Sequence, residues 1–476
     1  MWITGLACIT VAGVPVWSVG IYHPVYLEVL PKDFIHRIAI NKEDDGQLVV
    51  DAWQQADAIV EAIQEPQFPE YTVNVRELGA RADGTHNDLP ALQTAVDQCS
   101  EAGGGAVQVP AGIYWLEGPL HLKSNINLQL GEGSILRFSA DLDDFLPVVY
   151  TRWEGTRLFN YSPFIYAIGV ENVAITGAGT IDGNSKGKFE GWFEKQRPDQ
   201  DRLRTMGAQA TPLEKRIFGK GHYLRPSFMQ FIDCDRIKIE GVKIVNSPFW
   251  IIHPVFSKHI TIRDVHIESM VLQNDGVDID SSSYVLVENC TFRTGDDAIA
   301  IKSGRDREGR ELGRPSENIV IRNNTCHEVH NGFAIGSEMS GSVRNVFIEN
   351  NTIESGRNLI FFKSNLDRGG VVENVHVRNI RVDYASHNLI RFQTDYHGFR
   401  GGNHPPVFRN FRIENVTCKE AETGIRVEGH AEAPVTEVVI RDVTIEKAMK
   451  PVALNEHDRV ELINVLINGR EFGNPE

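Results

Sequence analysis

Apolar and polar residues alternate in short runs from about residue 168 to the end of the chain, and alternation of period two is typical of β-strands. Each run ends at a polar or small corner residue, and further apolar positions follow the corner. Most intervals between successive corners are 22 to 36 residues, so one structural unit is predicted to repeat. The aligned corners are Gly177, Gly241, Asp264, Asn289, Asn323, Asn350, Asn379, Asn415, Asp442 and Asn464.

This repeat predicts an all-β fold, a right-handed parallel β-helix (a solenoid), in which each coil buries its apolar face only against its neighbours. Asparagine at the corners fits the left-handed backbone conformation, and stacked asparagine amides can hydrogen-bond along the axis. A leucine-rich repeat is the alternative, but the spacing is irregular and a helical half is absent. A predicted helix at 89–102, capped by Asn87 or Asp88, precedes the strands and indicates an N-terminal helical cap.

Three segments of different composition follow one another along the chain. Residues 1–24 are apolar and carry no Asp, Glu, Lys or Arg, which predicts an export signal or a membrane anchor. Residues 25–70 form an N-terminal extension with one predicted helix at 51–64, and residues 71–476 form the β-helix. We therefore expect an exported protein, whether periplasmic, extracellular or membrane-anchored, and a monomer.

The chain is acidic, with a net charge of −16, which argues against a nucleic-acid partner. An anionic substrate would need a local basic patch. The insertion at 304–316 contains a cluster of arginines, the first of which is Arg305, and could supply such a patch. A second insertion interrupts the repeat at 184–226. The six cysteines show no metal-ligand spacing, and Cys326 and Cys418 are predicted to be small buried apolar residues. Neither a metal nor a cofactor is predicted.

Candidate chemistry concentrates in one acidic stretch. Asp275 and Asp296 are 21 positions apart (296 − 275 = 21), about one coil, so they are expected to stack at about 4.8 Å, with Asp297 beside them. Like charges this close raise the pKa of at least one carboxyl, which then stays protonated while a neighbour is ionised. General acid–base hydrolysis of a glycoside needs these two states.

Two further aspartates lie in the same stretch. Asp278 and Asp280 alternate with Val277 and Ile279, which should point inward, so both aspartates are predicted to face outward as turn residues.

The motifs resemble those of the polygalacturonase family (family-28 glycoside hydrolases), which cleaves pectin on a parallel β-helix. The likeness runs from about Thr72 to the end and includes GARADGTHNDLPALQTAV and, at 246–254, NSPFWIIHP. Four separated motifs are more specific. The family's Asn-Thr-Asp-Gly, Gly-Asp-Asp, Gly-His-Gly and Arg-Ile-Lys appear in order as QNDG at 273–276, GDD at 295–297, VHN at 329–331 followed by GFAIGSE, and FFK at 361–363.

The resemblance implies a role for each matching residue. Asp296 resembles the general acid that protonates the leaving oxygen, Asp275 and Asp297 resemble the carboxylates that activate water, and His330 resembles the residue that tunes the acid. The family inverts configuration, and inversion is implied here. The candidates for substrate binding are Lys363, Lys302, Phe361, His253 and Arg305.

One departure bears on the substrate. Phe361 stands where the family has an arginine, and Phe cannot pair with a galacturonate carboxylate, whereas an aromatic ring can stack on a neutral sugar. We therefore expect rhamnogalacturonan or a substituted pectin fragment rather than plain homogalacturonan. The insertion at 184–226 could close one end of the groove, which predicts exo-action on oligosaccharides.

Two other functions share these features. A calcium-dependent polysaccharide lyase is built on the same fold, and the alternation of Asp275, Asp278 and Asp280 resembles a calcium site. A non-catalytic glycan-binding β-helix is the second alternative, and it predicts binding without turnover.

Overall fold

The computed structural model describes residues 8–11, 14–17, 40–42, 48–189, 191–397 and 400–473, with side chains from residue 51 onward. The chain divides into two compact units, Met1–Ala58 and Ile59–Glu476. The first unit contains two antiparallel strand pairs and the start of a helix. Its elements are β1 (Cys8–Val11), β2 (Val14–Trp17), β3 (Ile40–Lys42), β4 (Leu48–Val50) and α1 (Ala52–Ala62), the last of which continues into the second unit.

The export signal or anchor predicted at 1–24 lies mostly outside the described residues, and the parts that are described are β1 and β2. Among the described residues, no helix has both the length and the apolar character that a membrane crossing requires. The helix predicted at 51–64 is confirmed as α1.

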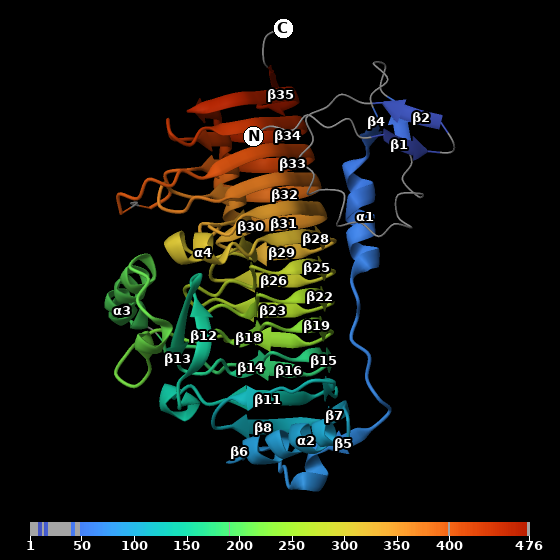
Figure 1. The fold of residues 1–476 in the computed structure, drawn as a ribbon, viewed down its shortest axis with the longest axis vertical. Coiled ribbons are helices and arrows are strands. Elements are labelled where there is room, and N and C mark those ends of the chain that lie inside the picture. Colours follow the sequence, from blue (N-terminus) through green and yellow to red (C-terminus); the bar gives the residue numbers. More distant parts are fainter. Residues whose placement is uncertain are drawn as a thin grey trace. The chain divides into compact units, whose positions relative to one another are not determined.

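The second unit is, as predicted, a right-handed parallel β-helix (Figure 1). Its first coils contain β5 (Thr72–Asn74), β6 (Asp83–Asn87), β7 (Gly105–Val109), β8 (Gly112–Leu116), β9 (Leu120–His121), β10 (Ile126–Leu130), β11 (Ser134–Phe138), β14 (Ile165–Ile168), β15 (Glu171–Gly177) and β16 (Thr180–Asp182). The middle coils contain β18 (Met229–Ile232), β19 (Asp235–Glu240), β20 (Lys243–Val245), β21 (Ile252–Val255), β22 (Lys258–Arg263), β23 (His266–Ser269), β24 (Val277–Asp280), β25 (Ser283–Glu288), β26 (Thr291–Thr294), β27 (Ile299–Lys302), β28 (Ser316–Arg322), β29 (Thr325–Glu328) and β30 (Asn331–Ile335).

In the last coils the corners are regular enough for single strands to run around them. These strands are β31 (Val343–Lys363), β32 (Val371–Gln393), β33 (Val407–Glu428), β34 (Val435–Asn455), β35 (His457–Ile467) and β36 (Arg470–Phe472). Each strand pairs in parallel with the strand one coil away, except β36, which folds back antiparallel on β35.

The register places like residues over like residues inside the coil. Ile360 pairs with Ile390, and Ile390 pairs with Ile425, so these three branched side chains form one buried column. Such columns let each coil bury an apolar face that it could not bury alone. The predicted core is therefore confirmed as one continuous cluster along the axis.

All ten predicted corner residues have a positive φ, which confirms that the corners are left-handed. Asparagine tolerates this conformation better than other residues with a Cβ, and its amide finds a partner on the next coil. Asn379 donates to Asn350 over 2.8 Å, and Asn415 donates to Asn379 over 2.6 Å. Glycine is needed at Gly241, where a Cβ would come 2.6 Å from the carbonyl oxygen of Gly177.

The N-terminal end of the core is covered by α2 (Leu89–Glu101), as predicted. Its apolar face, which includes Leu92, Val96 and Cys99, is fully buried. The capping bond at its start comes from Asn87, whose Oδ1 accepts the Leu89 N–H over 3.1 Å. Every cysteine in the part of the chain with described side chains is buried and free, including Cys326 and Cys418, as predicted.

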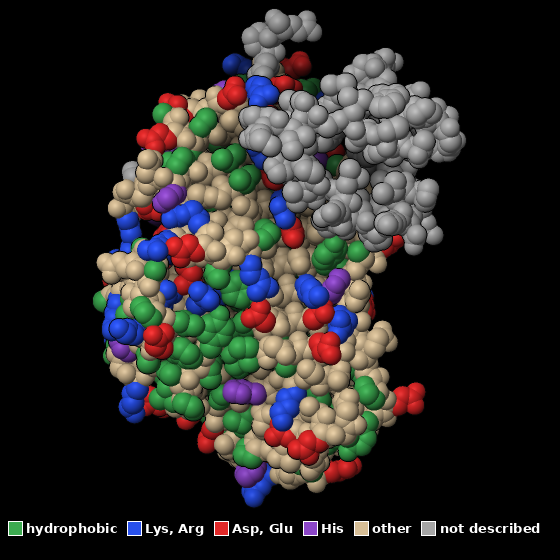
Figure 2. Space-filling view, viewed as in Figure 1, with side chains coloured by type: hydrophobic (Ala, Val, Ile, Leu, Met, Phe, Trp, Pro, Cys, Tyr) green, Lys and Arg blue, Asp and Glu red, His purple; other side chains and the backbone are tan. Residues whose placement is uncertain are grey.

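Several insertions lie along one side of the β-helix (Figure 1). They comprise the antiparallel pair β12 (Val149–Trp153) and β13 (Thr156–Asn160), the short β17 (Ile217–Phe218), α3 (Trp192–Ala208) and α4 (Asp306–Leu312). The remaining short helices are 3-10 turns: η2 (Val75–Leu78), η3 (Leu142–Phe145) and η4 (Leu213–Lys215). Figure 2 shows apolar side chains gathered on part of the visible face and acidic and basic ones interspersed elsewhere.

We predict that Phe392→Ala costs about 3–5 kcal/mol of unfolding free energy, because it leaves a cavity in the aromatic stack of the core. Phe392 is fully buried, 4.7 Å from the Phe362 ring and 5.0 Å from the Phe411 ring. Denaturant unfolding measures the loss. Tyr384→Ala on the same strand is the control, since Tyr384 is 46% exposed and should lose little. Equal losses in the two variants would contradict this core.

Candidate active site

Three aspartates from neighbouring coils meet on the outer surface of the β-helix. Asp275 precedes β24, and the pair Asp296–Asp297 precedes β27; these two strands are paired in parallel. One oxygen from each carboxylate lies within 4.8 Å of the others. The close packing requires Gly276, because a Cβ there would come 2.5 Å from the Ala298 carbonyl oxygen. The expected clustering of the three aspartates is therefore confirmed. The register, however, advances by 22 residues (299 − 277 = 22), which sets Asp275 over Asp297 and not over Asp296 as predicted.

Asp296 and Asp297 are adjacent in sequence but have opposite pKa shifts. Burial would raise the pKa of Asp297, but the charges of Lys363 and Lys302 and the Asn331 amide outweigh burial and lower it to about 2. Lys363 Nζ lies 3.0 Å from Oδ2, and Asn331 Nδ2 lies 2.5 Å from Oδ1. Burial and the negative charge of Asp297 raise the pKa of Asp296 to about 7. Near neutral pH one carboxyl can donate a proton while its neighbour is ionised.

The third carboxyl, Asp275, also has a raised pKa. Burial is the main cause, and the charges of Asp278 and Asp296 add to it. Lys302 opposes them, with its Nζ 3.7 Å from Asp275 Oδ2. Asp297 is therefore the member of the three that is most strongly held in its ionised form.

Asp278 and Asp280 were predicted to be turn residues that face outward, but they are not exposed to solvent. Both point away from the core, but both are fully buried. The reason is that the β12–β13 insertion brings Arg152 over this face, with its Nε 3.3 Å from Asp280 Oδ2. Asp278 instead lies 3.6 Å from the ammonium of Lys302. The two residues are part of the charged network, not of the surface.

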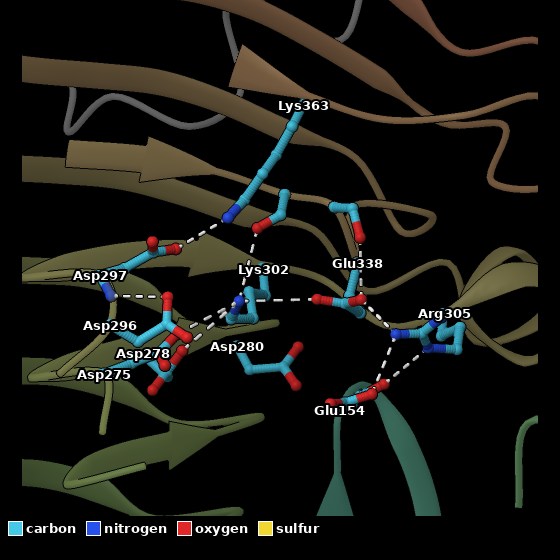
Figure 3. A network of polar contacts seen from close by, with 12 residues as sticks. Glu154, Asp275, Asp278, Asp280, Asp296, Asp297, Lys302, Arg305, Glu338 and Lys363 are labelled. Carbon is cyan, nitrogen blue, oxygen red and sulfur yellow. Dashed lines mark hydrogen bonds and ion pairs between the residues drawn. The ribbon is translucent and has the colours of Figure 1, made fainter. Parts of the chain in front are cut away.

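Lys302 occupies the centre of this network (Figure 3). Its ammonium lies 3.5 Å from Glu338 Oε2 in addition to its contacts with Asp275 and Asp278. The same ammonium is 4.6 Å from the centre of the Trp250 ring. Burial would lower the pKa of Lys302, but the surrounding carboxylates raise it overall, so the lysine is charged. A buried cation here balances carboxylates that could not all be buried alone.

A second set of ion pairs lies on the far side of Lys302 (Figure 3). Arg305 bonds both Glu154, over 3.2 Å, and Glu338. Arg368 pairs with Asp306 and lies 3.7 Å from Glu338. These residues come from the β12–β13 turn, the start of α4 and the loops after β30 and β31. The network therefore holds four separate segments against the aspartates.

The charged residues surround a cleft of about 310 Å³. α3 supplies one side of it with Phe193, Gln200 and Arg204. Tyr396, His397 and Arg400, which follow β32, supply another part. The cleft also contains the three aspartates together with Lys302, Lys363, Arg305 and Arg368.

The cluster of carboxylates raises the question of a bound cation. The ammonium groups of Lys302 and Lys363 already contact these oxygens and offset their charge. The charges of Asp275 and Asp297 are therefore offset within the protein by these two lysines.

A family model described as glycosyl hydrolases family 28 matches residues 99–460. The chain belongs to glycosyl hydrolase family 28. A probable polygalacturonase of Vitis vinifera is 29% identical over 397 residues, which are 80% of this chain and 75% of the relative. An exo-poly-alpha-D-galacturonosidase of Dickeya chrysanthemi is 25% identical over 385 residues, which are 73% of this chain and 62% of the relative.

A solved structure has the same fold and a more similar sequence. It is a hyperthermoactive exopolygalacturonase of Thermotoga maritima, with a TM-score of 0.85 and 41% identity, and the match covers 88% of this chain and 97% of the other. The family-28 chain described here is accordingly a glycoside hydrolase.

The predicted site residues fall into two groups. Asp275, Asp296, Asp297, Lys302, Lys363 and Arg305 all lie at the cleft. His330 lies beside it: its N–H donates to the Asp296 carbonyl over 3.2 Å, and its ring Nε2 faces Arg357 at 3.3 Å. Burial lowers the pKa of His330, which favours the neutral ring. Its tuning of the acid stays a prediction.

The structure does not place the other two predicted residues where a sugar could touch them. His253 is fully buried and bonds Gln230 over 2.8 Å, with its ring packed edge-on to Trp250, so it supports the cleft from below. Phe361 is only 2% exposed and lies behind Tyr396, whose ring centre is 5.9 Å away. The prediction that these two residues contact the substrate directly is therefore wrong, because neighbouring side chains cover both.

Sequence reasoning missed several residues of the cleft. Glu338 is the last residue of the GFAIGSE segment that follows the third family motif, so this segment could have indicated Glu338 as a site residue. Glu154, Arg204 and Arg368 carry no motif and enter the site only through distant insertions.

We predict that Asp296→Asn lowers kcat by about 10²–10⁴-fold, the usual contribution of a general acid, while the fold is retained. Steady-state kinetics and thermal unfolding measure both quantities. Asp264→Asn is the matched control, since Asp264 is an exposed corner residue and Asn suits its φ of 55°. Full activity in Asp296→Asn would remove this residue from the mechanism.

We predict that kcat of the wild type falls as the pH rises through about 7. Asp296 must be protonated to donate, and its raised pKa of about 7 means that the protonated form is lost above that pH. A pH–rate profile at saturating substrate measures this alkaline limb. An activity that stays constant from pH 6 to about 9 would contradict the assignment of Asp296 as the acid.

Proposed function

We propose that this protein hydrolyses the α-linked galacturonate chains of pectin from one chain end. The observation that carries the proposal is the pair of adjacent carboxyls with opposite pKa shifts, Asp296 at about 7 and Asp297 at about 2, inside a cation-lined cleft. The names of the family-28 relatives support the same substrate class, since they include a polygalacturonase and an exopolygalacturonase.

In the proposed reaction, water attacks the anomeric carbon as the glycosidic bond breaks. Asp296 gives its proton to the leaving oxygen, and the ionised Asp297 orients the water, accepts its proton and stabilises the positive charge that develops on the sugar. Asp275, whose pKa is raised, helps to position the water. We propose inversion, as the family does, and the anomer that forms first can be identified by proton NMR.

The cleft has cations available for an anionic sugar. Arg204 and Arg400 line it and keep 26% and 41% of their side-chain surface exposed. A guanidinium pairs well with a planar carboxylate. Arg204 is paired with Glu154 and Arg400 with Asp201. We propose that a uronate competes with these carboxylates for the two guanidinium groups, which gives the strongly acidic chain a local site for an anion.

Exo-action is supported by a contact at the edge of the cleft. Arg400 donates to Asp201 on α3 over 3.1 Å and to Thr205 over 3.2 Å. This contact joins the insertion at 184–226 to the segment after β32. We propose that this contact closes the end of the cleft at Arg400, so that a chain end can enter but a polymer cannot thread through.

The substrate expectation based on Phe361 had two parts. Stacking of the Phe361 ring on a neutral sugar is ruled out because the ring is buried, whereas the absence of the family's arginine at this position still stands. We propose unsubstituted galacturonan as the preferred substrate, since Arg204 and Arg400 line the cleft, with rhamnogalacturonan as a comparison in the assay. We also propose that the protein is exported, because its proposed substrate is a large extracellular polymer. We further propose that it is a monomer.

The decisive experiment is product analysis on polygalacturonate, rhamnogalacturonan and pectic oligosaccharides, with Asp296→Asn as the inactive control. We predict saturated monogalacturonate as the first product from polygalacturonate, with little early loss of viscosity. Chromatography with mass detection measures the products.

Each other outcome points to a different function. An unsaturated product that absorbs ultraviolet light and disappears with a chelator would indicate a calcium-dependent lyase. Tight binding without turnover would indicate a glycan-binding protein, and faster cleavage of rhamnogalacturonan would restore the sequence-based expectation.

We predict that Arg400→Ala releases several times more oligosaccharide relative to monomer, because the contact with α3 is lost. Product chromatography at low conversion measures the ratio. Arg381→Ala is the matched control, since Arg381 lies on β32, is largely exposed and is 3.8 Å from Asp383, away from the cleft. An unchanged ratio in Arg400→Ala would show that this contact does not set the mode of action.

A further inference from the structure

Three buried asparagines on successive coils form a continuous row that ends on Asp297. Asn331, Asn358 and Asn388 are each at most 5% exposed, and Asn331 pairs in register with Asn358, which pairs with Asn388. Asn331 stands where the family motif has glycine, so the residue that contacts Asp297 is a departure from that motif. We call these three residues the Asp297 ladder.

The amides of the Asp297 ladder all point in one direction. Asn388 Nδ2 donates to Asn358 Oδ1 over 2.7 Å, and Asn358 Nδ2 donates to Asn331 Oδ1 over 2.8 Å. Asn331 Nδ2 then donates to Asp297 Oδ1 over 2.5 Å. The positive end of every amide dipole therefore faces the carboxylate.

The direction of the row suits the chemistry of its last member. An ionised carboxylate only accepts hydrogen bonds, so Asn331 must present its amide nitrogen, which turns its oxygen toward the next coil. The same choice then passes to Asn358 and Asn388. At the far end, Asn388 Oδ1 is buried and has no hydrogen-bond partner among the residues that the structure describes. The row from Asn410 to Asn318 runs in the same direction without a carboxylate at its end. What distinguishes the Asp297 ladder is therefore that its last amide meets an ionised carboxylate, while a buried acceptor, which is costly to leave unpaired, stands at its other end.

We propose that the Asp297 ladder is a positioning device that carries amide polarisation from two coils away to Asp297 and keeps this carboxylate ionised and fixed during hydrolysis. Aligned hydrogen bonds polarise one another, so Asn358 and Asn388 act on Asp297 without touching it. The inference rests on the proposed function, in which Asp297 must be ionised to orient and deprotonate water.

Other charged groups face Asp297 and are shared by every variant below. Among the described residues they are the following titratable groups: Asp296 beside it, Asp275 and Asp278 from the preceding coil, Lys302 from β27, His330 from the loop before β30, Lys363 from β31 and Tyr396 after β32. The ladder variants leave all of these side chains in place, so a change in the acidic limb can be attributed to the amides.

The test is the pH dependence of kcat at saturating substrate. Asn331→Ala should raise the midpoint of the acidic limb by about one pH unit, since a hydrogen bond to a charged group has been lost. Asn358→Ala should raise it by about a tenth to a third of that amount, the share that polarisation adds per bond. The alkaline limb and KM should stay unchanged.

A matched control exists on the same strands. Asn374 donates to Asn345 over 3.2 Å and accepts from Asn410 over 2.5 Å, in a row that ends on Asn318 and not on an active-site carboxylate. Asn374→Ala breaks the same kind of bonds and should leave the acidic limb where it is. Substrate carboxylates titrate alike with all variants, so only the difference between ladder and control variants is interpreted.

The outcomes separate the ladder from the proposed function. If the wild type is active and the acidic limbs of Asn331→Ala and Asn358→Ala match that of Asn374→Ala, the ladder has no such role. Equal shifts in ladder and control variants would mean a general loss of stability and would also overturn it. If Asn358→Ala does not fold, Asn388→Ala, which removes the last amide of the row, supports the same comparison. A wild type inactive on every pectic substrate would instead overturn the proposed function.

Discussion

Parallel pairing between neighbouring coils is the constraint on which this structure depends. It sets each side chain about 4.8 Å from its counterpart one coil away. Apolar residues gain from this repetition, as the column of Ile360, Ile390 and Ile425 shows. The corners gain as well, because asparagine amides on successive coils bond one another. The same spacing forces Asp275 against Asp296 and Asp297, where repetition is unfavourable.

The cost of crowded and buried carboxylates is offset by two buried lysines. Lys363 lies against Asp297, whereas Lys302 is shared among Asp275, Asp278 and Glu338. Since the cations are distributed unevenly, the carboxylates do not titrate alike. Asp297 is held ionised, and its charge in turn helps Asp296 to keep a proton up to about pH 7. The lysines that make the buried carboxylates tolerable thus also give Asp296 and Asp297 the two different protonation states, acid and base, that hydrolysis needs.

The insertions convert an open groove on a regular β-helix into a bounded cleft. Glu154 on the β12–β13 turn, Arg204 on α3 and Arg368 after β31 come from different parts of the chain and join through ion pairs. Loops of varied length can leave the same corners without disturbing the stacked core, because each coil contacts only its neighbours. The β-helix therefore supplies the reacting groups, and the insertions determine what part of a polymer can reach them.

Local patterns along the chain determined the coil, its left-handed corners, the helix α2 and the meeting of Asp275 with Asp296, because each depends on residues within about one repeat. Tertiary structure alone decided what covers those residues. Asp280 faces away from the core as its alternation implies, yet Arg152, which is 128 positions away (280 − 152 = 128), removes it from solvent. Phe361 likewise follows its motif but is buried behind Tyr396. Periodicity encodes which way a side chain points, whereas its exposure depends on insertions that no periodicity describes.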